Sequence, residues 1–347
     1  MDIYIPPINF SNHNRQTLFI VTRPFYTQNG WVNDESVKKH WQVSNMFRYT
    51  SNIEEANALF IPCPINTYSR QELKGFNALC ALQNIPGYGY ISGDFGKQYP
   101  EFSNLTYFRM GGFKSQLNSK NRGFPVFLSD GYERIYNKSN MDVRPKGRKP
   151  VIGFCGHANA SVPKYLKEKL TFTKENFKRF IEKPLRKDYE PLFSSAYQRA
   201  AVLKPIENSL AVTANFIYRK RYRAGVATAS ERQKTNREYF DNILNSDYIV
   251  CVRGGGNFSV RLYETLMMGR IPIFVNTDCM LPFEDTIDWK KHTVWVEWKD
   301  RKNIAKITDE FHNALSDHEF EQLQISNRKL WKETLSVSNV LKMILTK

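Results

Sequence analysis

The stretch VRGGGNFSVRLYE, residues 252–264, decides the fold of the second half of the chain. It places three consecutive glycines between an apolar run and a segment in which apolar residues recur with helical spacing. Together with the apolar runs at 247–252 and 271–276, it predicts a strand, a helix over 259–268 and a second strand, in that order. Such units build parallel sheets covered by helices, so the stretch predicts an α/β fold.

The glycines follow a strand, at the place where a parallel sheet binds its ligands. In an open sheet of this class, the crevice forms at the carboxyl ends of the strands, next to helix N-termini. Gly254, Gly255 and Gly256 lack the Cβ that would screen their N–H groups, and Ser259 is the expected N-cap of the helix. A phosphorylated ligand explains such a loop, and so does a tight structural turn. The loop is neither a Walker A sequence nor a G-x-G-x-x-G fingerprint.

Two charged residues of the predicted helix favour the ligand over the turn. Arg261 and Glu264 are three positions apart and therefore share one face of the helix. The helix dipole disfavours a cation near the N-terminus, whereas a diphosphate bound there would account for Arg261. Glu264 would then accept hydrogen bonds from ribose hydroxyls. The alternative is a surface ion pair between the two residues, which would contribute only ~0.3–0.5 kcal/mol.

Apolar runs alternate with helical patterns along most of the chain, which extends the α/β prediction to the whole sequence. Further strands are expected at TLFIVT (17–22), ALFIPC (58–63), GYGYIS (87–92), FPVFL (124–128), within VIGFCGHANAS (151–161) and within SLAVTANFIY (209–218). Helices are expected at 69–82, within 162–203, at 231–245 and within 304–345. The basic, Pro- and Gly-containing stretch at 137–150 predicts a boundary between domains 1–145 and 146–325. Residues 326–347 are expected to form a C-terminal helix that packs back on the first domain.

The net charge of +16 over 347 residues calls for a polyanionic partner. Nucleic acid, an anionic membrane surface and a phosphorylated substrate are the three classes to weigh. No nucleic acid is expected, because the sequence contains no RNA-binding signature or zinc finger. A peripheral membrane enzyme with phosphate-bearing substrates explains the positive charge and does not require a nucleic-acid-binding motif.

Cysteine usage and the apolar runs bear on location. The five cysteines are scattered without a C-x-x-C pair, which favours buried free thiols in a reducing compartment and excludes a zinc site of the usual spacing. The apolar runs are shorter than the about 20 residues that span a bilayer, and the N-terminal residues lack a signal-peptide pattern. We therefore expect a cytoplasmic protein that contacts the inner face of the membrane.

The region 252–289 resembles the signature region of the exostosin family of glycosyltransferases. The similarity consists of an Arg-Gly loop, a Ser-x-Arg-Leu-x-Glu helix, a Gly-x-Ile-Pro strand and a Leu-Pro-Phe-x-Asp-x-Ile-Asp-Trp tail. In this chain they occur at Arg253–Gly254, Ser259–Glu264, Gly269–Pro272 and Leu281–Trp289. Two weaker similarities, at 51–66 and 148–159, come in the order that the family has.

The resemblance implies a GT-B fold of two facing Rossmann-like domains with a C-terminal helical segment. The first domain would bind the acceptor and the second the nucleotide-sugar donor, with a UDP-sugar as the expected co-substrate. Transfer would be inverting and would need neither a metal nor another cofactor, and the acceptor would be a glycan or a lipid-linked saccharide. Without the membrane anchor of eukaryotic members, a soluble enzyme of envelope or capsule polysaccharide synthesis is expected. The alternatives are another GT-B transferase, such as a fucosyltransferase, and a non-catalytic polyanion-binding protein.

The resemblance also assigns donor-binding roles outside the helix. Arg253 belongs to the Arg-Gly loop, and Gly156 and His157 lie in the loop that would approach the sugar phosphate. Arg223, in the basic run YRKRYRAG (218–225), would offset the charge of the leaving diphosphate in place of a metal. The simpler alternatives are that His157 has a structural role and that the basic run 218–225 is a solvated surface.

Inversion needs a general base that deprotonates the acceptor hydroxyl. Asp130, in FLSDGY, and Asp94, in ISGDFG, each follow an expected strand inside a glycine-containing turn. Asp130 is the preferred candidate because it is closer to the expected domain boundary. Either residue could instead serve the turn alone.

Overall fold

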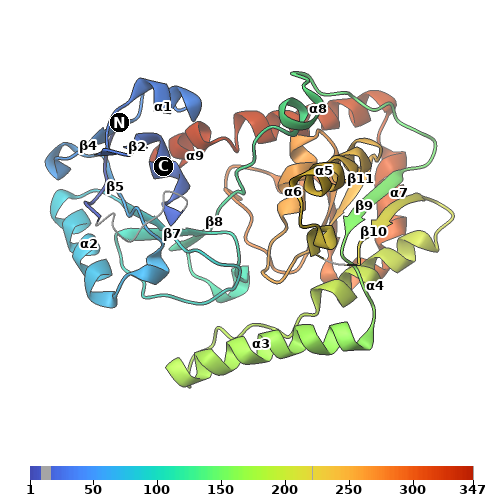
Figure 1. Ribbon diagram of the computed structural model, residues 1–347, viewed down its shortest axis with the longest axis horizontal. Coiled ribbons are helices and arrows are strands. Elements are labelled where there is room, and N and C mark those ends of the chain that lie inside the picture. Colours follow the sequence, from blue (N-terminus) through green and yellow to red (C-terminus); the bar gives the residue numbers. More distant parts are fainter. Residues whose placement is uncertain (9–16, 221, 347) are drawn as a thin grey trace. The chain divides into compact units, whose positions relative to one another are not determined.

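The computed structural model describes residues 1–8, 17–220 and 222–346 (Figure 1). The chain forms two compact units, and each contains a parallel sheet with helices. The first unit comprises residues 1–127, 280–283 and 333–347, and the second comprises 128–279 and 284–332. The predicted α/β class, with two Rossmann-like units and C-terminal helices, is confirmed.

The boundary between the units follows residue 127 and not residue 145. Residues from Leu128 onward belong to the second unit, where Tyr132 forms a hydrogen bond and Arg144 an ion pair with other residues of that unit. The Tyr132 hydroxyl donates to the carbonyl of Met268 over 3.3 Å, and Arg144 pairs with Asp247. At the other end of the chain, residues 333–347 belong to the first unit, where the Tyr88 hydroxyl donates to the carbonyl of Ile344.

The sheet of the first unit has the strand order β4-β1-β5-β6-β7-β8, with parallel pairing throughout. Its strands are β1 (Asp2–Tyr4), β4 (Arg48–Thr50), β5 (Ala58–Phe60), β6 (Gly87–Tyr90), β7 (Leu105–Arg109) and β8 (Asn121–Gly123). The helices are α1 (Glu35–His40), α2 (Arg70–Gln83) and α9 (Val337–Leu345), and β2 (Tyr26–Thr27) pairs with β3 (Gly30–Trp31) in a small antiparallel hairpin. Helix α2 begins at the predicted residue because Ser69 and Glu72 form a capping box.

Two predicted strands of this unit are wrong. Residues 20–25 form a 3₁₀ helix instead of the strand expected at 17–22, and Phe19 is buried among aromatic rings. A fully buried apolar run has no alternation, so its pattern does not distinguish a strand from a packed turn. The strand expected at 124–128 ends at Gly123; the Phe124 amide still bonds to the carbonyl of Arg109, but Pro125 has no N–H to continue the ladder.

The sheet of the second unit has the parallel order β10-β9-β11-β12-β13. Its strands are β9 (Val151–Gly156), β10 (Thr213–Tyr218), β11 (Tyr248–Cys251), β12 (Ile271–Asn276) and β13 (Val294–Glu297). The helices are α3 (Val162–Glu182), α4 (Ser195–Glu207), α5 (Ala229–Leu244), α6 (Val260–Met267), α7 (Ile304–Ala314) and α8 (Asp317–Glu333). The strand–helix–strand unit predicted from 252–264 is therefore present as β11, α6 and β12.

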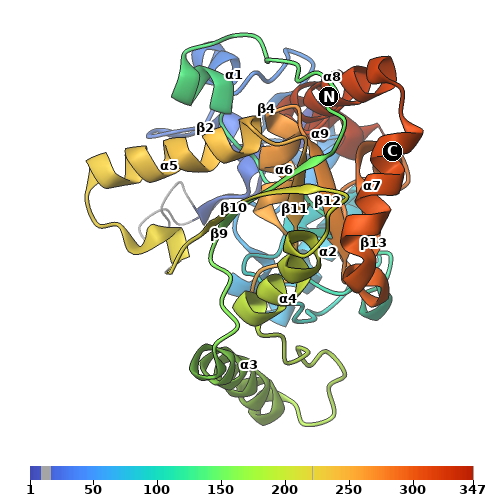
Figure 2. The ribbon, with the colours of Figure 1, turned by 90° about the vertical axis from the view of Figure 1, so that its right-hand side faces the viewer.

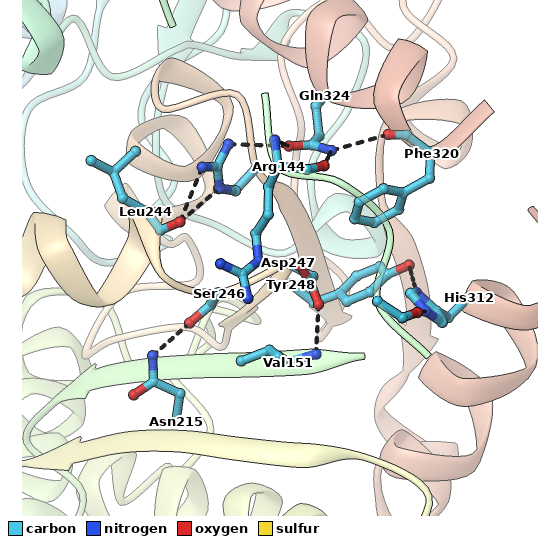
Figure 3. Close-up of polar contacts among 12 residues, drawn as sticks. Arg144, Val151, Asn215, Leu244, Ser246, Asp247, Tyr248, His312, Phe320 and Gln324 are labelled. Atoms are coloured by element: carbon cyan, nitrogen blue, oxygen red, sulfur yellow. Dashed lines mark hydrogen bonds and ion pairs between the residues drawn. The ribbon is translucent and has the colours of Figure 1, made fainter. Parts of the chain in front are cut away.

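A polar network fixes the starts of β9 and β11 (Figure 3). The carboxylate of Asp247 is 1% exposed and accepts hydrogen bonds from the Val151 amide at 2.7 Å and from Arg144 Nε at 2.5 Å. His312 is buried between the Tyr248 hydroxyl and the Gly147 carbonyl, so its Nε2 carries the proton that is donated to the carbonyl. Because both strands are fixed at their starts, their carboxyl ends are held in register at the opposite edge.

The predicted buried thiols are confirmed, since all five cysteines are free and buried. Of the helices in the described ranges, none has the length and apolarity required to traverse a bilayer.

Candidate functional site

The site lies where the strand order of the second sheet reverses. After β9 the chain adds β10 on one side and then returns to add β11 on the other. The loops that leave the carboxyl ends of β9 and β11 therefore diverge, and ligands of open α/β sheets bind in the crevice between two such loops. Here these loops carry Gly156 and His157 after β9, and Gly254, Gly255 and Gly256 after β11.

The glycine loop is open on its outer side. A Cβ added to Gly255 would meet nothing within 4 Å, and one added to Gly254 would lie 3.4 Å from Arg199 Nη2. Neither glycine has a positive φ, so the backbone does not demand glycine for its conformation. Gly255 is exposed and leaves its backbone accessible, which is the property that a bound anion uses, whereas the Gly254 amide donates to the carbonyl of Phe258 at 3.2 Å.

Asn257 fixes the rear of the loop to the end of β12. Its side chain is 1% exposed, and its Nδ2 donates to the carbonyls of Thr277 and Asp278 at 2.9 Å each. Its Oδ1 accepts from the Thr277 hydroxyl at 2.7 Å. The sequence does not suggest this role, because Asn257 resembles an ordinary loop asparagine until the partner strand is placed beside it.

Helix α6 starts as predicted, with Ser259 in the N-cap position. The Ser259 side chain makes no cap hydrogen bond, so it does not satisfy the amides of the first helical turn. Those amides, together with the positive end of the helix dipole, face the end of the glycine loop that joins the helix.

Arg261 lies across the ends of β9 and β11. Its Nη2 donates to the carbonyl of Cys155 at 2.9 Å, and its Nη1 contacts the carbonyl of Val250 at 3.5 Å. The guanidinium stacks on the ring of Phe154, 4.4 Å from the ring centroid. A Cβ on Gly156 would come within 2.9 Å of Nη2, so Gly156 provides the space that this side chain occupies.

The charge of Arg261 has no ionic partner in the described part of the chain. None of the described carboxylates forms an ion pair with it, and its Nε is buried without a hydrogen-bond partner. Burial opposes the charged form, but Tyr239, Cys251 and Glu264 raise the pKa of Arg261 above its ordinary value. The site therefore contains a partly buried, permanently charged guanidinium that forms no direct ion pair with a described carboxylate, although the nearby charge of Glu264 compensates part of its charge.

Glu264 bonds to a tyrosine and not to Arg261. The Tyr239 hydroxyl, which α5 contributes, donates to Glu264 Oε2 at 2.5 Å. Burial raises the pKa of Tyr239 well above its ordinary value, and the neighbouring charge of Glu264 adds to this rise, so the hydroxyl remains a donor. The surface ion pair that was the alternative interpretation of Arg261 and Glu264 is not formed.

Arg253 stabilises the glycine loop from within. It is 2% exposed, stacks on Phe193 at 4.5 Å and donates from Nη2 to the carbonyl of Gly255 at 2.9 Å. Burial lowers its pKa. These contacts make Arg253 a residue that positions the loop; whether it also touches a ligand stays a prediction.

His157 presents one ring nitrogen to the site. Because the carbonyl of Arg219 can only accept, His157 Nδ1 carries the proton that is donated to it at 3.0 Å. In the neutral ring Nε2 is then a hydrogen-bond acceptor, and it is buried without a partner. Arg199, from α4, lies above the same loop, with its Nη1 3.5 Å from the carbonyl of His157.

Arg199, Tyr239 and Phe193 are among the residues of the site that sequence reasoning missed. They are contributed by α4, by α5 and by the segment before α4, far from the signature region. No local pattern distinguishes them from other arginines and aromatic residues. The predicted ligand Arg223 lies in the turn Tyr222–Gly225, and its side chain is outside the described part of the structure.

The two candidate bases have different surroundings. Asp130, in the second unit, holds Arg328 through both carboxylate oxygens, at 3.1 and 2.5 Å, and caps the turn that follows by accepting from the Tyr132 amide. These contacts argue against Asp130 as the base, because the charge and both oxygens are already engaged. Asp94, in the first unit, reaches solvent, and no described residue forms an ion pair with it. Desolvation by the surrounding loop raises its pKa.

Within the described ranges, no group of three or more histidine, cysteine, aspartate or glutamate side chains could hold a metal ion.

Comparison with known proteins identifies the region that contains this site. Residues 163–311 match the family model of the Exostosin GT47 domain. This part of the chain is similar to the exostosin GT47 domain. The predicted relationship to the exostosin family of glycosyltransferases is thereby confirmed, and the domain includes the glycine loop, α6 and four of the five strands of the second sheet.

Individual relatives agree with this assignment. A probable glucuronoxylan glucuronosyltransferase of Arabidopsis thaliana is 25% identical over 215 residues, which is 53% of this chain and 45% of the relative. Exostosin-1 of Drosophila melanogaster is 30% identical over 102 residues, 28% of this chain and 13% of the relative. The chain thus spans less than half the length of these relatives.

Among solved structures, HepE of Anabaena in complex with UDP-glucose is similar at a TM-score of 0.35 and 8% identity, over 100% of this chain and 98% of that one. TarM of S. aureus, in complex with fondaparinux, α-GlcNAc-glycerol and UDP, is similar at a TM-score of 0.36 and 11% identity, over 83% and 54% of the two chains. The site assignments above rest on the chain's own geometry.

Proposed function

We propose that this chain transfers a sugar from a nucleotide-diphosphate sugar to a saccharide acceptor, with inversion and without a metal. The observation that carries the proposal is the partly buried guanidinium of Arg261, which lies across the ends of β9 and β11 and forms no direct ion pair with a described carboxylate. A buried cation is costly unless an anion compensates it. The diphosphate of a donor, bound at the N-terminus of α6, would supply that anion.

In this proposal the protein offsets the charge of the leaving diphosphate with fixed cations and dipoles. Arg261 contributes a positive charge that it keeps at physiological pH, and the amides of Gly255 and of the first turn of α6 contribute oriented N–H groups. Groups that are already oriented need no reorganisation when charge develops on the leaving group. His157 Nε2, as an acceptor, suits a hydroxyl of the transferred sugar.

Glu264 is the proposed ribose ligand. Its Oε2 accepts from Tyr239, which holds the carboxylate in one orientation. A carboxylate held in this way is oriented to accept hydrogen bonds from the hydroxyls of a ribose. A UDP-sugar is the proposed donor, on the strength of the family resemblance.

Asp94 is the proposed general base, in preference to Asp130. A base must be free to take a proton, and its efficiency increases when its pKa lies closer to the working pH. The raised pKa of Asp94 supports this role, whereas the ion pair with Arg328 opposes it for Asp130.

The acceptor and the location belong to the same proposal. We propose a glycan or lipid-linked acceptor in envelope or capsule polysaccharide synthesis, in the cytoplasm at the inner face of the membrane. The net charge of +16 supports a location next to an anionic surface.

Calorimetric titration with UDP tests the donor site. Arg261→Ala is expected to raise the dissociation constant at least about 10-fold, the order of a lost charge-assisted hydrogen bond. Arg70→Ala, at an exposed position of α2, is the matched control and should bind UDP like the wild type. Equal affinities of the two variants would remove Arg261 from the site.

Donor turnover separates an enzyme from a non-catalytic polyanion-binding protein. Release of a nucleoside diphosphate from a nucleotide sugar, increased by a saccharide acceptor and retained in EDTA, is the expected result. Tight, strongly salt-dependent binding of heparin without any nucleotide binding would instead favour the polyanion-binding protein. Activity that is lost in EDTA and restored by manganese would contradict the metal-free mechanism.

A further inference from the structure

Helix α3 packs on the second unit through a side that combines Phe172, which is 4% exposed, with polar residues. Glu168 accepts hydrogen bonds from the Ser194 hydroxyl at 2.7 Å and from the Ala196 amide at 3.0 Å, at the start of α4. Asn176 forms a reciprocal pair with the backbone of Glu190, with both hydrogen bonds at 2.8 Å. Figure 2 shows α3 beyond α4, at the outer edge of this unit. This side of α3 is therefore fixed to the second unit.

The opposite side of α3 is an exposed apolar stripe. Six large side chains at positions three, four or seven residues apart share this face, and each is 51–66% exposed. They are Val162, Leu166, Leu170, Phe177, Phe180 and Ile181. Leu185, just past the end of the helix, is 90% exposed. A contiguous apolar surface of this kind marks an interaction site on a folded protein.

Lysines line the border of the stripe. Lys167, Lys174 and Lys178 are exposed and follow one edge of it along the helix. Lys183 and Lys187 continue the basic border beside Leu185. Large apolar side chains bordered by lysines are the pattern of a helix that lies in the plane of a membrane interface.

We propose that α3 binds an anionic membrane surface, with the stripe among the acyl chains and the lysines at the lipid phosphates. Charge complementarity selects this occupant, because the lysine border attracts anionic headgroups. A second copy of the chain would bring two lysine borders together, and the net charge of +16 would add to the repulsion. The proposal does not depend on transferase activity, since it concerns the surface by which the chain meets the bilayer.

Co-sedimentation of the full chain with vesicles tests the proposal. The wild type is expected to bind vesicles of phosphatidylcholine with phosphatidylglycerol, and not vesicles of phosphatidylcholine alone. A Lys167→Gln, Lys174→Gln, Lys178→Gln variant should bind about 100-fold more weakly, at about fivefold for each lysine near the surface. A Leu170→Ser, Phe177→Ser, Ile181→Ser variant should lose binding to the vesicles that contain phosphatidylglycerol.

The controls use Leu82 and Lys74, which are exposed on helix α2 and do not belong to the apolar stripe or to its lysine border. Leu82→Ser and Lys74→Gln should bind vesicles like the wild type. Because all substituted positions are exposed, unchanged melting temperatures are expected and exclude misfolding as the cause. A Phe180→Trp variant gives a direct readout, since its emission should shift to the blue when anionic vesicles are added.

Three results would overturn the proposal. The first is a wild type that does not bind the anionic vesicles. The second is a stripe variant that binds them as the wild type does. The third is a concentration-dependent dimer that the stripe variant abolishes, which would assign the stripe to a second copy of the chain.

Discussion

Gly156 lies directly against the side chain of Arg261, because a Cβ on Gly156 would be 2.9 Å from Arg261 Nη2. The same Nη2 donates a hydrogen bond to the carbonyl of Cys155 at 2.9 Å. The glycine ends β9, and the arginine lies in the first turn of α6. Two positions that are 105 residues apart in the sequence thus form one element of the proposed donor site.

Gly156→Ala is therefore expected to weaken nucleotide binding without unfolding the protein. The new methyl group would displace the guanidinium from the Cys155 carbonyl, and only the end of a side chain has to move. We expect the dissociation constant for UDP to rise about 10-fold, measured by calorimetry, because one charge-assisted hydrogen bond is disturbed.

Gly255→Ala is the matched comparison for this prediction. A Cβ there meets nothing within 4 Å, so the stability of the free protein should not change. UDP should nevertheless bind more weakly if the diphosphate approaches that backbone. Wild-type affinity in both variants would show that the nucleotide does not use this corner of the sheet.

Glu264→Gln should discriminate between the two parts of the nucleotide. If Glu264 binds the ribose, the variant should bind UDP about 10-fold more weakly and inorganic pyrophosphate as tightly as the wild type. Arg261→Ala should weaken the binding of both ligands. Calorimetry with the two ligands measures the difference, and a Glu264→Gln variant that loses pyrophosphate affinity would contradict the assignment to the ribose.

Substitution of the two aspartates should give opposite results. Asp94→Asn is expected to abolish turnover and leave the unfolding free energy nearly unchanged. Asp130→Asn should lower the unfolding free energy by about 3 kcal/mol, because it breaks a mostly buried ion pair with Arg328. Urea titration and a turnover assay measure the two effects, and a stable but inactive Asp130→Asn variant would reverse the assignment.

The pH dependence of turnover follows from the raised pKa of Asp94. The base acts in its deprotonated form, so kcat/KM should fall as the pH decreases through that pKa. Because desolvation raises the pKa of Asp94, the acid limb should lie above 3.8, the ordinary value for an aspartate. An acid limb that is unchanged in a partially active Asp94→Glu variant would assign it to another group.

The second unit was predictable because its signals are local. The glycine loop, the N-cap Ser259 and the apolar strands that flank α6 are close together in sequence, and the observed elements follow them within a residue or two. The first unit was less predictable. Its short strands, such as Asp2–Tyr4 and Arg48–Thr50, pair across long stretches of chain, and three residues carry no readable period.

Within the site, the identity of residues was predictable but their partners were not. The signature region indicated Arg261 and Glu264, yet it could not indicate that Tyr239 binds Glu264 or that Phe154 supports Arg261. Those partners come from other elements and are fixed only by the packing of α5 and β9. The ion pair between Asp130 and Arg328 could not be predicted for the same reason, since 198 residues separate the two in the sequence.

A crystal structure of the chain with UDP tests the central claim most directly. The account predicts that the β-phosphate lies against the amides of Gly255 and the first turn of α6, within reach of Arg261, with the ribose at Glu264. A nucleotide bound elsewhere, with the glycine loop unchanged and the guanidinium of Arg261 facing only the two carbonyls, would contradict it.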